Sequence, residues 1–144
     1  MYQDKIKLPA MFWVIAVFAL LWNALGLIAY LSDMFISSEA IAAMEPDMQR
    51  LHTESPIYQK IVYGLAVFSG VLGSIGLLLR KSWAVQVFAL SLVCVILQLI
   101  ISIAATNAFE ILGLNALILP SVVILIAAFL FWHSRNAHRS GQIA

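Results

Sequence analysis

The sequence predicts an all-α integral membrane protein whose four transmembrane helices run up and down in one bundle. Of its 144 residues, 63% are hydrophobic and only 10% are charged. Soluble domains have about 45–50% apolar and about 25% charged residues, and a soluble chain of this size could not bury so much apolar surface. The apolar residues also form four long stretches with no charge in their interiors. We therefore expect one transmembrane domain over residues 1–144.

Each apolar stretch is long enough to be a membrane-spanning helix. At about 1.5 Å per residue, each of them crosses a hydrocarbon core of about 30 Å. Backbone polar groups in lipid must be satisfied within their own segment, which favours helices. The predicted spans are residues 8–31, 57–79, 83–105 and 111–132. Because the second and third links between them are short, consecutive helices are expected to be antiparallel neighbours.

The long first loop, residues 32–56, has the pattern of two short amphipathic helices. Ser38 with Glu39 predicts one helix start, and Pro46 with Asp47 predicts a second. The apolar residues of the loop recur at helical spacing and share one face: Ile41, Met44, Met48 and Leu51. We expect these helices to lie over the outer mouth of the bundle. Its carboxylates match no known cation-binding loop, which favours a solvated acidic face.

The distribution of charge predicts the orientation. Six of the eight basic residues lie near the termini or in the turn after the second span: Lys5, Lys7, Arg80, Lys81, Arg135 and Arg139. Six of the seven acidic residues lie in the first and third loops: Asp33, Glu39, Glu45, Asp47, Glu54 and Glu110. Basic residues concentrate on the cytoplasmic side of membrane proteins. Both termini are therefore expected in the cytoplasm and the first loop on the opposite side.

Uncharged polar residues inside the spans are the main chemical clue. Counting about 1.5 Å per residue from the middle of each span puts Asn23 and Gln98 at a similar depth. Ser69, Ser121 and the Ala116 carbonyl, which Pro120 leaves without its helical donor, lie close to that level. We expect one polar layer, formed either by hydrogen bonds between helices or by a site for a small polar ligand. Residues expected to support close packing are Gly26, Gly70, Gly73, Gly76 and Pro120.

The spans lack the residues that most membrane chemistry requires. Ion-coupled transport usually relies on an ionisable residue within a span, and the four spans contain none in their interiors. No nucleophile–base pair or group of metal ligands is recognisable in the sequence. The net charge of +1 gives no basic surface for nucleic acid, and one cysteine forms no intramolecular disulfide. We therefore expect no enzymatic activity, no cofactor and no metal site.

Several short motifs resemble a protein family. They are Trp22-Asn23-x-x-Gly26-x-x-x-Tyr30, the run from Leu77 to Ala84 around Arg80-Lys81-Ser82, and Val87-Phe88-x-x-Ser91-Leu92. With the acidic first loop, these motifs resemble a family of small bacterial inner-membrane proteins with four spans, whose members are often labelled sugar transporters. The resemblance implies a bacterial inner membrane and a periplasmic first loop. It supplies no substrate and no catalytic residue.

The sequence leaves two functional hypotheses open. The first is a non-enzymatic binding or accessory subunit in the lipid bilayer, alone, as a homo-oligomer or with another membrane protein. The second is a transporter or channel for a small neutral solute such as a sugar. Because four helices enclose little space, the second hypothesis is expected to require an oligomer.

Overall fold

The structure, a computed structural model, describes residues 8–105 and 108–144. Over these residues it contains helices and no strands. The helices are α1 (Ala10–Met34), α2 (Ser38–Ala42), α3 (Pro46–Glu54), α4 (Ile57–Leu78), α5 (Trp83–Ala105), α6 (Ala108–Leu112) and α7 (Asn115–Arg139). Four of them, α1, α4, α5 and α7, are long and apolar enough to cross a membrane. The chain is thus an all-α, multi-pass membrane protein, as the sequence predicts.

The second and third predicted spans agree with α4 and α5 to within one residue. The fourth differs, because its apolar run is divided into α6 and α7. Gly113 interrupts it with a φ of 61°, a left-handed conformation that a residue without a Cβ adopts at little cost. α7 then continues to Arg139, well beyond the predicted end at residue 132. Lys5 and Lys7, used in the prediction of orientation, lie outside the described residues.

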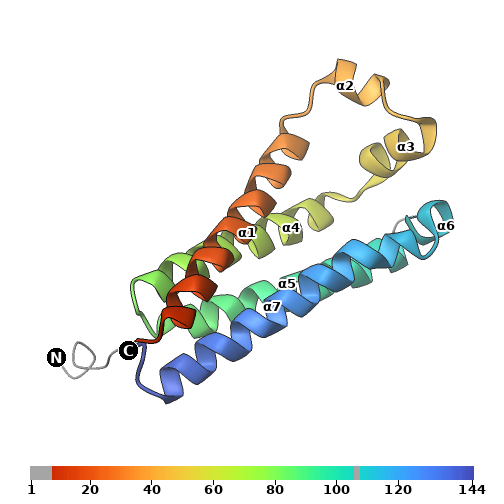
Figure 1. Cartoon of the computed structure of the whole chain (residues 1–144). Helices are drawn as coiled ribbons and strands as arrows, with labels where there is room; N and C mark the ends of the chain where they lie inside the picture. Colours follow the sequence, from red (N-terminus) through yellow and green to blue (C-terminus); the bar gives the residue numbers. More distant parts are fainter. Residues whose placement is uncertain (1–7, 106–107) are drawn as a thin grey trace.

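The four spans pack in the order α1, α4, α5, α7, with the most extensive contact between α4 and α5. We call the end of the bundle at α2, α3 and α6 the loop end, and the end at the α4–α5 turn the terminal end. At the terminal end α1 and α7 meet, and the rings of Phe12 and His133 lie 6.0 Å apart. Toward the loop end the α1–α4 pair and the α5–α7 pair separate (Figure 1). The bundle is closed at one end and spread at the other.

Glycines of α4 allow its neighbours to come close. A Cβ atom at Gly70 would lie 2.1 Å from the Asn23 Oδ1 of α1, and one at Gly73 would lie 2.9 Å from the Phe88 ring of α5. At Gly76 the nearest atom, from Trp83, would be 2.7 Å away. No side chain larger than hydrogen fits there without movement of its neighbour. α4 is therefore the central helix, in contact with α1 on one face and α5 on another.

The terminal end is held by the turn after α4 and by residues 140–144. Arg80 has a φ of 58°, and the Lys81 N–H donates to the Gly76 carbonyl over 2.8 Å, which closes the helix in a Schellman-type turn. The Arg80 side chain donates from Nε to the Gln142 carbonyl over 3.0 Å. The backbone carbonyl of Arg80 accepts from the Ala144 N–H. Ile143 is buried in the core between the spans. These contacts join the two helix pairs where they converge.

The first loop contains the two predicted short helices. α3 begins at Pro46 as expected, whereas the N-cap of α2 is Ser37, whose side chain accepts from the Ala40 N–H over 3.1 Å. Both helices lie at the loop end of the bundle, as expected, but on the α1–α4 side of its mouth rather than across it. α2 and α3 pack against each other beyond the ends of α1 and α4 (Figure 1), and in the described residues neither contacts α5, α6 or α7 extensively. Because short links connect them to α1 and α4, they lie with this pair on the side away from α5 and α7.

Candidate functional site

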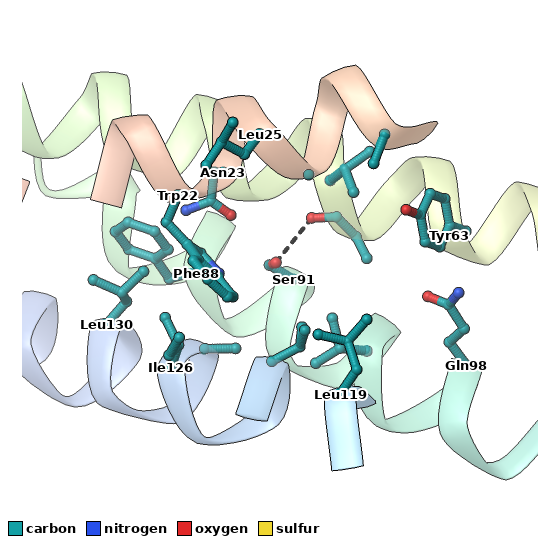
Figure 2. Close-up of a pocket in the computed structure, with 17 residues that line it drawn as sticks. Trp22, Asn23, Leu25, Tyr63, Phe88, Ser91, Gln98, Leu119, Ile126 and Leu130 are labelled. Carbon is teal, nitrogen blue, oxygen red and sulfur yellow. Dashed lines mark hydrogen bonds between the residues drawn. The ribbon is translucent and has the colours of Figure 1, made fainter. Parts of the chain in front are cut away.

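A cavity of about 270 Å³ lies between the two helix pairs and is lined by residues from all four spans. Its walls are mainly apolar. Apolar lining residues include Leu25, Val67, Phe88, Val95, Leu119, Val123, Ile126 and Leu130. Phe88 and Leu130 form one end of the cavity together with Trp22, and Tyr63 and Gln98 form the other (Figure 2).

Asn23 and Ser91 line the cavity, and both donate hydrogen bonds within the protein. Asn23 donates from Nδ2 to the Ala19 carbonyl (2.8 Å) and to Ser74 Oγ (3.2 Å). Ser91 Oγ donates to the Ala66 carbonyl over 2.9 Å (Figure 2). Both side chains therefore hold neighbouring spans together. The middle of the cavity offers few polar partners for a ligand.

Gln98 lines the same cavity as Asn23 at a different level. Asn23 and Ser91 both lie next to Gly70. Gln98 is seven residues beyond Ser91 on α5, about 10 Å closer to the loop end at the helical rise. Tyr63 on α4 is seven residues before Gly70 and reaches the same level, where it lines the cavity opposite Gln98 (Figure 2). The polar groups of the cavity thus lie at two levels.

The structure therefore brings Asn23 and Gln98 to one cavity, at two levels rather than in the single predicted layer, whereas Ser69 and Ser121 do not line it. Ser69 is buried, donates to carbonyls of its own helix at Leu65 and Ala66, and does not line the cavity. Ser121 is exposed on the outer surface of α7. Pro120 lies within α7, which continues through it, and it lines a small side pocket with Gln98. Gly26 also lines the main cavity, where a Cβ atom would lie 3.6 Å from Val67.

A second, polar pocket of about 180 Å³ lies at the loop end, where α3 and the start of α4 meet the end of α1. Its lining residues are Asp33, Met34, His52, Ser55, Gln59, Lys60, Tyr63 and Gln98. The last two also line the main cavity. Asp33 Oδ1 lies 3.2 Å from His52 Nδ1, which ties α3 to the end of α1. The apolar cavity and the polar pocket are therefore neighbours that share one wall.

Sequence reasoning missed Ser74, the hydrogen-bond partner of Asn23, and missed that Tyr63 faces a cavity. Ser74 lies four residues from Gly70, on the helical face that meets Asn23, and this spacing could have identified it. The place of Tyr63 beside Gln98 depends on which helices pack together, which no pattern within one span indicates. Among residues 8–105 and 108–144, no three histidine, cysteine, aspartate or glutamate side chains lie close enough to hold a metal.

Fold and site together define a four-span membrane protein with an apolar cavity between two helix pairs and a polar pocket beside it. Comparisons with protein-family models, with curated protein sequences and with solved structures found no match for this chain.

Proposed function

We propose that the protein is a non-enzymatic membrane subunit that binds an apolar or amphipathic molecule between its two helix pairs. The supporting observation is the cavity of about 270 Å³ lined by all four spans. Small-molecule sites are typically concave and mainly apolar, with few polar groups that set the orientation. Tyr63 and Gln98, at one end of the cavity, have this arrangement.

The chemistry of the walls favours an apolar ligand over a sugar-like one. A hydroxyl-rich solute needs many hydrogen-bond partners, because burying an unpaired hydroxyl costs about 1–3 kcal/mol. Asn23 and Ser91 already donate to protein acceptors. An apolar chain requires no such partners, and it gains from leaving water or from filling an unoccupied volume.

A ligand could enter from the bilayer. α1 and α7 meet at the terminal end, but toward the loop end the two helix pairs diverge (Figure 1). Residues of both helices nevertheless line the cavity, among them Ala29 of α1 and Leu119 of α7. The side of the bundle between α1 and α7 is thus the path that requires the least displacement of packed helices. Lateral entry of this kind suits a molecule that is already dissolved in the membrane.

Filling the cavity tests the proposal. Ala127 lines it from α7, and Ala127→Phe places a ring in the space of the ligand. Leu125→Phe is the matched control, since Leu125 is 70% exposed on the same helix. We expect Ala127→Phe to weaken binding of a fluorescent fatty acid at least tenfold, equivalent to about 1.4 kcal/mol, and Leu125→Phe to leave it unchanged. Equal binding by both variants and the parent would contradict the cavity as the site.

We also propose that the protein lies in a bacterial inner membrane with both termini in the cytoplasm. Arg80, Lys81, Arg135 and Arg139 support it, since all four lie at the terminal end or on the part of α7 that leads to it. The sequence resemblance to four-span inner-membrane proteins points the same way. Single cysteines introduced at Glu45 and at Lys81, in a Cys94→Ser background, test the orientation. A membrane-impermeant maleimide added to intact cells is expected to label only the first position.

Transport of a small neutral solute, such as a sugar, is the second candidate. The polar pocket favours it, because this pocket joins the cavity at Tyr63 and Gln98 and could admit a solute from water. An oligomer would be needed to enclose a complete path. Uptake by reconstituted vesicles that is abolished by Gln98→Leu would favour transport. Absence of uptake, combined with fatty-acid binding, would favour the binding subunit.

A further inference from the structure

The polar pocket is in the right place to hold the polar end of a molecule whose apolar end lies in the cavity. It shares Tyr63 and Gln98 with the cavity, and both residues lie at the loop end of that cavity (Figure 2). Lys60 lines the pocket in the first turn of α4, which begins at Ile57. Helix ends lie at the membrane–water boundary, where the headgroups of lipids also lie. An amphiphile with its chain in the cavity would thus keep the depth and orientation that it has in the lipid bilayer.

Lys60 brings a positive charge to this pocket without an acidic partner. The acidic residue of the pocket, Asp33, is instead 3.2 Å from His52. Among the described residues, no carboxylate oxygen lies within 4.0 Å of the Lys60 ammonium group. Lys60 is half-buried, so solvent reaches its side chain only in part. A negatively charged ligand group in the pocket would give this ammonium group an ion pair in a position that water screens weakly.

Gln59, the neighbour of Lys60, adds an unsatisfied acceptor. Its Oε1 atom is buried and has no hydrogen-bond donor. The same side chain lines the polar pocket, and rotation of its terminal amide would turn the oxygen toward a ligand. A ligand that carries an N–H or O–H donor next to its negative group would satisfy both residues. The pocket therefore favours an anion and a donor close together.

From these groups we infer that the pocket binds the headgroup of a glycerophospholipid whose phosphodiester is followed by an amine or hydroxyl donor. The phosphate pairs with Lys60, the donor reaches Gln59, and one acyl chain occupies the apolar cavity. The ethanolamine and glycerol headgroups have this chemistry. The choline headgroup has the phosphate without the donor, and diacylglycerol has a hydroxyl without the phosphate. This assignment rests on the proposed function, because it requires the chain to lie in the cavity.

Lipid binding to the full-length protein, measured by native mass spectrometry from micelles, tests the assignment. The probes are phosphatidylethanolamine, phosphatidylglycerol, phosphatidylcholine and diacylglycerol with identical chains. We expect the first two to bind at least tenfold more tightly than the last two. Lys60→Gln should remove this preference, and Lys60→Arg should retain it. Lys81→Gln, an exposed lysine at the terminal end, is the matched control and should change nothing.

The possible outcomes separate the headgroup assignment from the proposed function. Equal binding of all four lipids, reduced by Ala127→Phe, would overturn the headgroup assignment and leave the cavity function standing. Failure of every lipid to bind would overturn the headgroup assignment, and failure of the fluorescent fatty acid to bind as well would overturn the proposed function. If soluble glycerol phosphate displaced the lipids at an equal concentration, the pocket would be a site for a free phosphate ester, and the lipid assignment would be wrong. Loss of the preference in Lys60→Gln alone, with the fold intact by circular dichroism, would support the assignment.

Discussion

Gly73 of α4 lies under the ring of Phe88, and an added methyl group there measures how tightly α4 and α5 pack. A Cβ atom at Gly73 would be 2.9 Å from two ring carbons, closer than the 3.0 Å below which such contacts essentially do not occur. Phe88 is 2% exposed and forms part of the cavity wall, so its ring can yield only toward the cavity. Overpacking of this kind costs about 1–3 kcal/mol. We expect Gly73→Ala to lower the free energy of unfolding by that amount, less any gain in helix propensity.

Gly26→Ala is the matched control for Gly73→Ala. Its new Cβ would lie 3.6 Å from Val67, an ordinary van der Waals contact. Both changes gain the same helix propensity, at most about 1 kcal/mol. The difference between the free energies of unfolding of the two variants therefore gives the cost of the clash, about 1–3 kcal/mol. Unfolding in mixed micelles can be followed through alkylation of the buried thiol of Cys94. Equal stability of the two variants would refute the reasoning about the α4–α5 contact.

Three further changes test other contacts, each by unfolding in the same micelles. Ser91→Ala removes the hydrogen bond to the Ala66 carbonyl and is expected to cost about 0.6 kcal/mol, and at most about 2. Arg80→Ala should be less stable than Arg80→Gly by about 1–2 kcal/mol, because both lose the bond to Gln142 but only alanine is strained at a φ of 58°. Ser121→Leu should change stability by less than about 0.5 kcal/mol and leave lipid binding intact, since Ser121 is exposed on α7. Greater stability of the alanine variant at Arg80, or loss of binding at Ser121, would contradict these assignments.

Much of the fold could be predicted from the sequence because membrane spans are determined locally. Length, hydropathy and absence of charge gave α4 and α5 almost to the residue. The same signals missed the start of α7, because hydropathy does not distinguish an apolar helix from an apolar turn at Gly113. They also missed its end, since a helix that leaves the membrane can continue in water as far as Arg139. Pro46 was a reliable start signal for α3, and the start of α2 was in error by one residue at its cap.

The site was harder to predict because it depends on contacts between distant segments. Asn23 and Gln98 would lie at equal depth only if the midpoints of all spans lay at one level. In the structure Asn23 lies beside Gly70 and Ser91, whereas Gln98 lies two helical turns away. The cavity itself arises because α1 and α7 diverge toward the loop end, and no spacing within a single span encodes that divergence. The sequence therefore indicates which polar residues in the spans are unusual, but it does not indicate which residues they contact.

Photo-crosslinking with a lipid that carries a diazirine in its acyl chain tests the occupancy of the cavity most directly. The labelled residues are identified by mass spectrometry after digestion. Labels are expected on residues of all four spans that face the cavity, such as Gly26, Val95 and Ala127. Ala127→Phe should remove them. Labelling confined to outward-facing residues such as Leu21 and Leu125, and unaffected by Ala127→Phe, would contradict the proposal that a lipid chain lies between the helix pairs.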